Sequence, residues 1–439
     1  MRCRPVANAR RLITRRNLLI VAVLGLIGVL GALAASWRPA IAPIAVPPRA
    51  SFAQTEIARG AILARIGDCA VCHTADGGRP FAGGRALPTP FGTLYSDNLT
   101  PDPATGIGNW SAAAFRRALK DGVARDGSHL YPALPYEHFT HTTDRDLDAL
   151  YAYLMTRDPV VAPAPPNKLI PPLGFRPLLA GWKLLFLHKG PVKGDPTQSA
   201  EWNRGAYLAE SLGHCGACHT PRNLAGAEER SRAYAGGVAE GWRAPALDAR
   251  NPAAIVWTKD ALFTYLRTGI SPQHSAAAGP MGPVVADLAQ VPEGDVRAIA
   301  TYIASKMAGG RRDNAAVARS IDAPDRAAGT NPAGAVLFAG ACAGCHGPGA
   351  PMMGQGRPSL ALATSLRDAD PTSAIQAVLQ GIAPPVADRG PKMPSFADSL
   401  SNAEVAQTLA YARARYTDEP AWADLEKRVK SARKEGTAQ

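Results

Sequence analysis

The chain has 439 residues, 46% of them hydrophobic and only 6% aromatic, with 42 glycines and 39 prolines. This length and apolar content exclude wholesale disorder and predict two to four small domains joined by much loop. The net charge of +12 is concentrated at the N-terminus, where residues 1–50 hold eight arginines and no acidic residue. Little positive charge remains for a basic face elsewhere, so we expect no nucleic-acid partner.

The first element in chain order is an uncharged run from Leu18 to Ala35, preceded by six arginines and followed by Trp37 and Arg38. Eighteen helical residues just cross a bilayer core, and the arginines would remain cytoplasmic. We favour an uncleaved membrane anchor over a cleaved signal peptide, whose apolar run is usually shorter. A twin-arginine export signal at Arg15 and Arg16 ranks third. Each alternative places the bulk of the chain on the periplasmic side of a bacterial cytoplasmic membrane.

Six of the seven cysteines form three pairs, each with two residues between the cysteines and a histidine directly after the second. The three motifs are Cys69, Cys72 and His73; Cys215, Cys218 and His219; and Cys342, Cys345 and His346. This spacing is the attachment signal for c-type haem, in which both thiols bond the porphyrin and the histidine binds the iron. We therefore expect three covalently bound haem c groups. The seventh, Cys3, lies in the leader and is expected to be inert.

Other uses of paired cysteines fit less well. A disulfide framework would not explain the histidine after each pair. A zinc site takes four ligands from two pairs in one domain, but these pairs lie 146 and 127 residues apart. A thioredoxin-like motif needs a preceding strand, whereas the residues before each pair have a helical pattern. Haem attachment precedes folding outside the cytoplasm, which is why the twin-arginine route for folded cargo ranks low.

The same helical pattern recurs around each haem motif. A glycine followed by apolar residues precedes each motif, at Gly60, Gly205 and Gly334. An amphipathic segment follows, at 110–122, 257–269 and 375–381, and a closing helix ends each repeat, at 144–155, 293–305 and 401–415. With almost no alternating strand pattern, the sequence predicts an all-α fold. It consists of three tandem class I cytochrome c domains after the N-terminal membrane or signal helix.

The expected boundaries follow the composition. They are a leader at 1–50, domains at 51–158, 199–307 and 332–416, linkers at 159–198 and 308–331, and a charged tail at 417–439. The tail alternates in sign and is expected to form a solvated helix. The first linker is rich in proline and contains an apolar stretch at 175–188. We expect this stretch to pack between the first two domains; the alternative is a helix at a membrane surface or partner.

Methionine is the usual sixth iron ligand in cytochromes c. Met281 lies 62 residues after His219 in a loop framed by glycine and proline, and Met393 lies 47 residues after His346 between lysine and proline. Both loops suit presentation of a thioether to the open face of a haem. We therefore expect Met281 and Met393 to complete the second and third iron sites.

The first repeat departs from this pattern, because Leu134 stands where methionine is expected. We favour His138 as the substitute ligand; His141, or an iron without a protein ligand, are the alternatives. A haem bound by two histidines has a lower potential than one bound by histidine and methionine. We therefore expect electrons to arrive at the first haem and to leave from the others.

Residues 51–415 resemble the three-haem cytochrome c subunit of membrane-bound bacterial dehydrogenases. The resemblance rests on several stretches besides the haem motifs: 96–101, 105–108, 110–111, 129–132, 176–179, 181–182, 201–207, 213–223 and 265–269. It implies an electron-transfer subunit, not an enzyme by itself, that accepts electrons from a large dehydrogenase subunit. It also implies delivery to ubiquinone, or to a cytochrome and terminal oxidase. Leu134 in place of methionine resembles the molybdenum-hydroxylase partners more than the alcohol-oxidising ones.

Two other functions remain open. A haem enzyme of the peroxidase or reductase type would use an open first iron, and carbon monoxide or cyanide would then bind one third of the haem. A carrier without a fixed partner would purify alone. The sequence shows no catalytic dyad and no phosphate-binding loop, so haem would supply all the redox chemistry.

Overall fold

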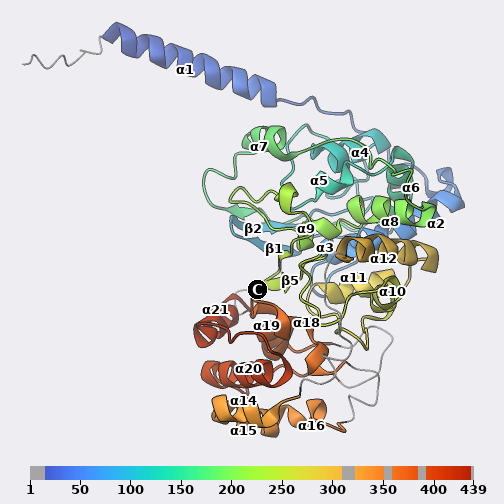
Figure 1. Ribbon diagram of the computed structural model, residues 1–439. Coiled ribbons are helices and arrows are strands. Elements are labelled where there is room, and N and C mark those ends of the chain that lie inside the picture. Colours follow the sequence, from blue (N-terminus) through green and yellow to red (C-terminus); the bar gives the residue numbers. More distant parts are fainter. Residues whose placement is uncertain (1–14, 309–321, 351–357, 384–391, 437–439) are drawn as a thin grey trace, which may run out of the picture.

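The computed structural model describes residues 15–308, 322–350, 358–383 and 392–436. Figure 1 shows an N-terminal helix projecting from a body in which helical segments follow one another from the blue to the red end of the chain. We name these segments unit one (residues 54–155, helices α2 to α6), unit two (residues 200–307, helices α8 to α12) and unit three (the described residues of 324–436, helices α14 to α21). Cys3 lies outside the described residues.

The helices of the N-terminal half are α1 (Arg15–Ser36), α2 (Gln54–Ile66), α3 (Cys69–Cys72), α4 (Ala112–Asp121), α5 (Tyr136–Phe139), α6 (Asp144–Met155) and α7 (Leu178–Phe186). Unit two contains α8 (Ala200–Glu210), α9 (Cys215–His219), α10 (Lys259–Thr268), α11 (Met281–Leu288) and α12 (Glu293–Met307). Unit three contains α14 (Pro324–Thr330), α15 (Pro332–Ala341), α16 (Ala343–His346), α18 (Thr364–Arg367), α19 (Thr372–Gln380), α20 (Asn402–Tyr416) and α21 (Leu425–Gly436). Short 3-10 turns occur at Arg49–Ser51, Arg230–Arg232 and Leu360–Leu362.

Each unit is built around two helices that cross at a glycine: α2 with α6, α8 with α12, and α15 with α20. A Cβ atom on the glycine would lie only 1.9 to 2.2 Å from a carbonyl oxygen of the facing helix. The three glycine–carbonyl pairs are Gly60 with Ala149, Gly205 with Ala298, and Gly334 with Gln407. The recurring glycine of the sequence is therefore explained by the close approach of two backbones, which any side chain would prevent.

The middle helices α4 and α10 begin and end where the sequence predicts, whereas α19 begins at Thr372, three residues before the predicted start. Ser111 and Thr258 accept hydrogen bonds from the backbone N–H of Ala114 and Ala261, and so satisfy free donors at the starts of α4 and α10. Gly122 ends α4 with a φ of 59°, a conformation that favours glycine. These caps fix where both helices begin and where α4 ends.

The all-α expectation is wrong in detail, because the described residues also include two small antiparallel sheets. One has the order β1 (Ala86–Thr89), β2 (Gly92–Tyr95), β3 (Lys168–Leu169), and the other pairs β4 (Gly237–Ala239) with β5 (Trp242–Ala244). The β4–β5 turn has positive φ at Glu240 (47°) and Gly241 (74°), as a two-residue hairpin turn requires. Strands of two to four residues are too short to produce a readable alternation in the sequence.

Units one and two share one hydrophobic core, to which both crossing pairs contribute, for example Leu63 and Leu150 from unit one and Leu208 and Val296 from unit two. Unit three has a separate core around Phe338. The expectation of a merely solvated tail is wrong for one face of α21. Three of its apolar side chains are buried in the core of unit three: Leu425, Val429 and Ala432.

The two expected linkers differ in structure. The first holds β3 and α7, and the bounds of α7 fall within the predicted apolar stretch. In the second, residues 309–321 lie outside the described residues, and α14 packs against α20, so this end of the predicted linker belongs structurally to unit three. The N-terminal helix α1 is apolar and long enough to cross a membrane by length and composition.

Candidate haem sites

The three cysteine motifs form short helices at corresponding places, directly after the first crossing helix of each unit. The residues before the first two cysteines, Asp68 and His214, have positive φ values of 49° and 33°, which turn the chain sharply into α3 and α9. All six motif cysteines are unpaired thiols. Within the described ranges, no group of three or more His, Cys, Asp or Glu side chains could hold a metal ion.

In the first two motifs the histidine ring is held by a backbone carbonyl. His73 Nδ1 lies 2.6 Å from the Asp97 oxygen, and His219 Nδ1 lies 2.7 Å from the Pro245 oxygen. Since a carbonyl oxygen can only accept, Nδ1 must carry the hydrogen, and Nε2 keeps its lone pair. Burial lowers the pKa of both histidines, which favours this neutral form. Each ring is thus prepared to bind iron through Nε2.

His346 ends α16 in the third motif, and its backbone oxygen accepts a hydrogen bond of 3.2 Å from the Tyr416 hydroxyl. Tyr416 lies at the end of α20, so the closing helix of unit three fixes the position of the motif. Burial lowers the pKa of His346 as well, which again favours the neutral imidazole that a metal needs.

A continuous cavity of about 420 Å³ joins the second and third motifs. Its walls are mostly apolar and include Trp257, Leu262, Ile303 and Phe338. The predicted site residues that line it are Cys215, Cys218, His219, Met281, Cys342, His346 and Met393. The structure therefore brings each predicted methionine to the same cavity as its predicted histidine partner. Thiols, a neutral imidazole and apolar walls suit covalently attached haem.

Local structure positions both methionines. Met281 is the first residue of α11 and follows Gly279, whose φ of 52° and contact with the Trp242 ring leave no room for a Cβ. Met393 is held by its backbone oxygen, which accepts a 3.0 Å hydrogen bond from the N–H of Ile382, directly after α19. Met281 is therefore positioned by the tight turn that begins α11, and not in a loop as expected, whereas Met393 is positioned by a backbone hydrogen bond.

The structure does not place His138 as an iron ligand of the first site. Its Nδ1 lies 3.1 Å from the Glu210 backbone oxygen, and its Nε2 lies 2.9 Å from a carboxylate oxygen of Glu228. Both acceptors require an N–H donor, so the ring is the doubly protonated imidazolium, which has no lone pair for a metal. Burial alone would lower the pKa of His138, but the hydrogen bond and charge of Glu228 outweigh it and raise the pKa.

The other two histidines near Leu134 also have backbone partners. His141 Nδ1 contacts the Gly190 oxygen, and His129 Nε2 lies 2.8 Å from the Ser36 oxygen at the end of α1. Leu134 itself packs against the shared core. The sequence correctly located the break in the pattern at Leu134, but the partners of His138 could be found only once unit two was folded against unit one.

The first and second motifs lie back to back at the junction of units one and two. His214, directly before Cys215, has its Nε2 3.3 Å from the oxygen of Gly67, two residues before Cys69. Arg85 donates to the Val71 oxygen, inside the first motif, at 2.8 Å and to the Glu240 carboxylate of unit two at 2.9 Å. Hydrogen bonds of residues that flank the two motifs, and the bridge through Arg85, thus join this part of the two units.

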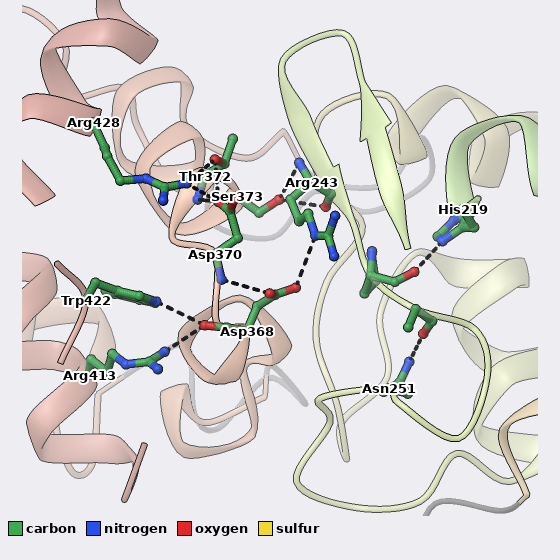
Figure 2. A network of polar contacts seen from close by, with 12 residues as sticks. His219, Arg243, Asn251, Asp368, Asp370, Thr372, Ser373, Arg413, Trp422 and Arg428 are labelled. Atoms are coloured by element: carbon green, nitrogen blue, oxygen red, sulfur yellow. Dashed lines mark hydrogen bonds and ion pairs between the residues drawn. The ribbon is translucent and has the colours of Figure 1, made fainter. Parts of the chain in front are cut away.

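Figure 2 shows how strand β5 connects the second motif to unit three. The backbone N–H of Arg243 donates to the Ser373 hydroxyl at 3.1 Å, and that hydroxyl donates to the Arg243 oxygen at 2.8 Å. Arg243 Nε lies 3.7 Å from a carboxylate oxygen of Asp368. Two residues beyond Arg243, Pro245 accepts the hydrogen bond from His219. The same short segment therefore orients the histidine of the second motif and contacts the next unit.

Sequence reasoning missed the carbonyl partners of His73 and His219. A backbone oxygen has no residue-type signature, so composition and motif searches do not find it. Their offsets are similar, 24 residues from His73 to Asp97 and 26 from His219 to Pro245. Aligning the repeats in space would have identified them. Arg243 was also missed, because its role depends on contacts with unit three.

Paired thiols beside a histidine whose Nδ1 is fixed, facing an apolar cavity, define a c-type cytochrome with covalently bound haem. The family model for cytochrome c matches residues 57–158, and the model for cytochrome c oxidase, cbb3-type, subunit III matches residues 329–411. The chain is 37% identical to the fructose dehydrogenase cytochrome subunit of Gluconobacter japonicus, covering 81% of this chain and 77% of the relative. It is 36% identical to the gluconate 2-dehydrogenase cytochrome c subunit of Pantoea cypripedii, covering 87% and 90%.

The chain therefore belongs to the family of cytochrome c subunits of bacterial dehydrogenases. As the sequence predicts, it is an electron-transfer subunit. It is also 48% identical to a nicotinate dehydrogenase subunit of Pseudomonas putida, covering 92% of this chain. The chain spans only 34% of the length of that relative.

Proposed function

We propose that the chain carries three covalently bound haem c groups in three tandem cytochrome c domains at 51–158, 199–307 and 332–416. The proposed attachment residues are Cys69, Cys72, Cys215, Cys218, Cys342 and Cys345, and the proposed iron ligands are His73, His219, His346, Met281 and Met393. The observation that carries this proposal is the cavity lined by the second and third sets, together with the hydrogen bond between His214 and Gly67, which flank the second and first motifs. Electrons could then cross all three sites over short gaps.

When bound, haem supplies the one-electron chemistry, and this chain supplies orientation and environment. Asp97 and Pro245 hold the rings of His73 and His219 by their Nδ1 hydrogens. Apolar walls exclude water around the second and third sites. Such walls and a thioether ligand favour the reduced, less charged state and raise the potential. These sites are therefore suited to receive electrons from the first.

The proposed donor is a large dehydrogenase subunit, and the proposed acceptor is ubiquinone, or a cytochrome leading to a terminal oxidase. The identity with the nicotinate dehydrogenase relative, together with Leu134, supports a partner of the molybdenum-hydroxylase type acting on an N-heteroaromatic substrate. Helix α1 would anchor the complex in the cytoplasmic membrane, with the haems on the periplasmic side.

The test is purification of the intact protein from membranes, followed by haem quantitation and identification of co-purifying chains. We expect about three haems per chain that resist acid-acetone extraction, and a large dehydrogenase subunit in stoichiometric amount. Extractable haem would contradict covalent attachment. A chain that purifies alone after mild solubilisation would favour the stand-alone carrier.

A second candidate, a haem enzyme, is favoured by one observation: Leu134 stands at the sixth-ligand position and the three nearby histidines have other partners. We infer that the first iron has no protein ligand on this face. It would then keep a lower potential than the methionine-bound sites, as expected of the point where electrons arrive. Peroxide turnover by the isolated subunit would support the enzyme; its absence would leave electron transfer as the function.

Leu134→Met tests the open first site. We expect carbon monoxide to bind about one third of the reduced haem in the wild type and none in the variant, because a thioether would occupy the iron. The variant should also raise the potential of one haem. Leu134→Ile is the matched control and should still bind carbon monoxide. Wild-type protein without carbon monoxide binding would show that another ligand completes the first site.

A further inference from the structure

Helix α7 has its polar and apolar sides reversed relative to a soluble helix. Its one charged side chain, Lys183, faces inward, is 8% exposed, and donates to the oxygens of Asp121 and Gly122 at the end of α4, at 2.9 and 2.8 Å. Leu184 and Leu185 on the other side are 86% and 68% exposed. A helix at a water-facing surface normally shows the opposite arrangement.

The residues before α7 extend this exposed apolar area. We define the α7 surface as the exposed side chains Ile170, Leu173, Phe175, Leu178, Leu184 and Leu185. A Cβ atom on Gly181, on the same side of the helix, would meet no atom within 4 Å. Contiguous exposed side chains of this size are unusual on a soluble protein and indicate a surface that contacts an apolar partner.

Hydrogen bonds to both neighbouring units hold the segment that carries the α7 surface. The Tyr131 hydroxyl donates to the Leu173 oxygen at 3.1 Å, and Arg176 donates to the His129 oxygen at 2.8 Å. On unit two, the Trp182 indole donates to the Ala225 oxygen at 2.9 Å. The inner side of α7 therefore does pack between the first two units, as the sequence analysis favours, and this packing directs the leucines outward.

The α7 surface adjoins the end of the membrane-crossing candidate. Helices α1 and α7 are in contact, and Figure 1 shows α7 on the side of the body from which α1 projects. His129 joins these elements, because its Nε2 bonds the Ser36 oxygen at the end of α1 while its own oxygen accepts from Arg176. Trp37, at this end of α1, is 70% exposed, as expected of a residue at a membrane interface.

The charge of this segment also fits a lipid surface. Residues 159–194 contain no aspartate or glutamate and five cations, of which Lys168, Lys189 and Lys193 are exposed; Lys189 also forms an ion pair with Asp121 of α4. Basic side chains that flank exposed leucines are typical of helices that lie on anionic membranes. Exposed apolar side chains alone would also suit a protein partner. The basic charge of this segment and the adjacent membrane-crossing candidate α1 favour a lipid surface.

We propose that the α7 surface lies at the boundary between the headgroups and acyl chains of the same bilayer that α1 enters. The crossing of the bilayer by α1 and the contact of the α7 surface with its boundary together fix unit one, and with it the first haem motif, against the membrane. The choice of bilayer rests on the proposed anchoring by α1. The α7 surface then acts as a second, interfacial attachment and determines the orientation of the body.

The test uses the full holoprotein with its co-purifying subunits, in nanodiscs of phosphatidylethanolamine and phosphatidylglycerol that contain a phospholipid with a photoreactive acyl chain. Cross-linked peptides are mapped by mass spectrometry. We expect adducts in α1 and in residues 170–187. The double variant Leu184→Glu with Leu185→Glu should lower the adducts at 170–187 by at least about tenfold and leave those in α1 unchanged. Val336→Glu, at a residue 75% exposed in unit three, is the matched control and should change neither.

The possible outcomes separate this inference from the proposed anchoring. Adducts in α1 without adducts at 170–187 would overturn the inference and leave the anchoring in place. Adducts in neither segment would overturn both. Cross-links from 170–187 to the large subunit in place of lipid would show that a protein covers the α7 surface, and would also overturn the inference.

Discussion

Units one and two meet very differently from units two and three. The first junction continues a single hydrophobic core across both units and buries the His138–Glu228 ion pair within it. The second junction joins two separate cores through strand β5, with the longer Arg243–Asp368 contact of 3.7 Å and the Ser373 hydrogen bonds. Units one and two therefore behave as one folding body, whereas unit three is attached to it by polar contacts and by the cavity that joins two haem motifs.

The comparison predicts its largest effect for loss of haem attachment. Replacing Cys342 and Cys345 by serine should leave about two haems per chain and should destabilise mainly unit three, because its core is separate. Replacing Cys215 and Cys218 should also leave about two haems, since attachment precedes folding, but should lower the thermal stability of units one and two together, because Leu262 and Ile303 of the cavity wall belong to the shared core. Haem quantitation and thermal unfolding check this. Equal losses of thermal stability in the two variants would contradict the comparison.

The next effect concerns the buried pair at the first junction. His138→Ala leaves the Glu228 carboxylate buried without its partner and should cost about 3–5 kcal/mol of unfolding free energy. Replacing both residues by leucine should recover most of this, because no charge then stays buried. Denaturant unfolding of the three proteins measures the differences. A single variant as stable as the double one would show that the pair is not buried in solution.

The same pair predicts a pH dependence. The pKa of His138 is raised in the fold, so its stabilising contribution is complete below about pH 6.5 and is lost as the pH rises through the folded value. Burial would raise the pKa of Glu228, but its hydrogen bond with His138 outweighs burial and lowers the pKa, so its contribution is lost as the pH falls below about 4. The stability difference between wild type and His138→Ala should therefore shrink at both extremes. Thermal unfolding across this range measures it.

A smaller effect is expected at Asp68, whose carboxyl lies beside that of Asp287 at the first junction. Burial and the Asp287 charge raise the pKa of Asp68, so the folded protein keeps a proton that the unfolded chain releases above about pH 4. Stability should consequently fall as the pH rises toward neutrality. Asp68→Asn should gain about 1 kcal/mol at pH 7 and less at pH 5. Asp76→Asn, at an exposed carboxyl, is the control and should change little.

The smallest effect is expected at the second junction. Arg243 and Asp368 keep partial solvent access and lie 3.7 Å apart, so Arg243→Gln should change the unfolding free energy by less than about 1 kcal/mol. The backbone hydrogen bonds of β5 to Ser373 remain in this variant. Denaturant unfolding at low and high salt measures the effect. A loss of several kcal/mol would show that the second junction is as tightly integrated as the first.

The sequence predicted most of the local structure. The bounds of α4, α6 and α10 follow from their caps and apolar spacing, and the cysteine motifs predicted the attachment helices. It did not predict the small sheets, because their strands are too short. It placed His138 at an iron, although the charge of Glu228, 90 residues away, converts that ring to a hydrogen-bond donor. Contacts between residues so far apart are not encoded in any local pattern.

By itself, the sequence determined that this protein is a c-type cytochrome. The reason is that covalent attachment needs two thiols and a histidine at a spacing that the chain repeats three times. Only the tertiary structure decided how the units are joined, which histidines remain able to bind iron, and which side of α7 faces outward. Each of these depends on which backbone oxygens and carboxylates the fold brings within hydrogen-bonding distance, and that is a property of packing between distant segments.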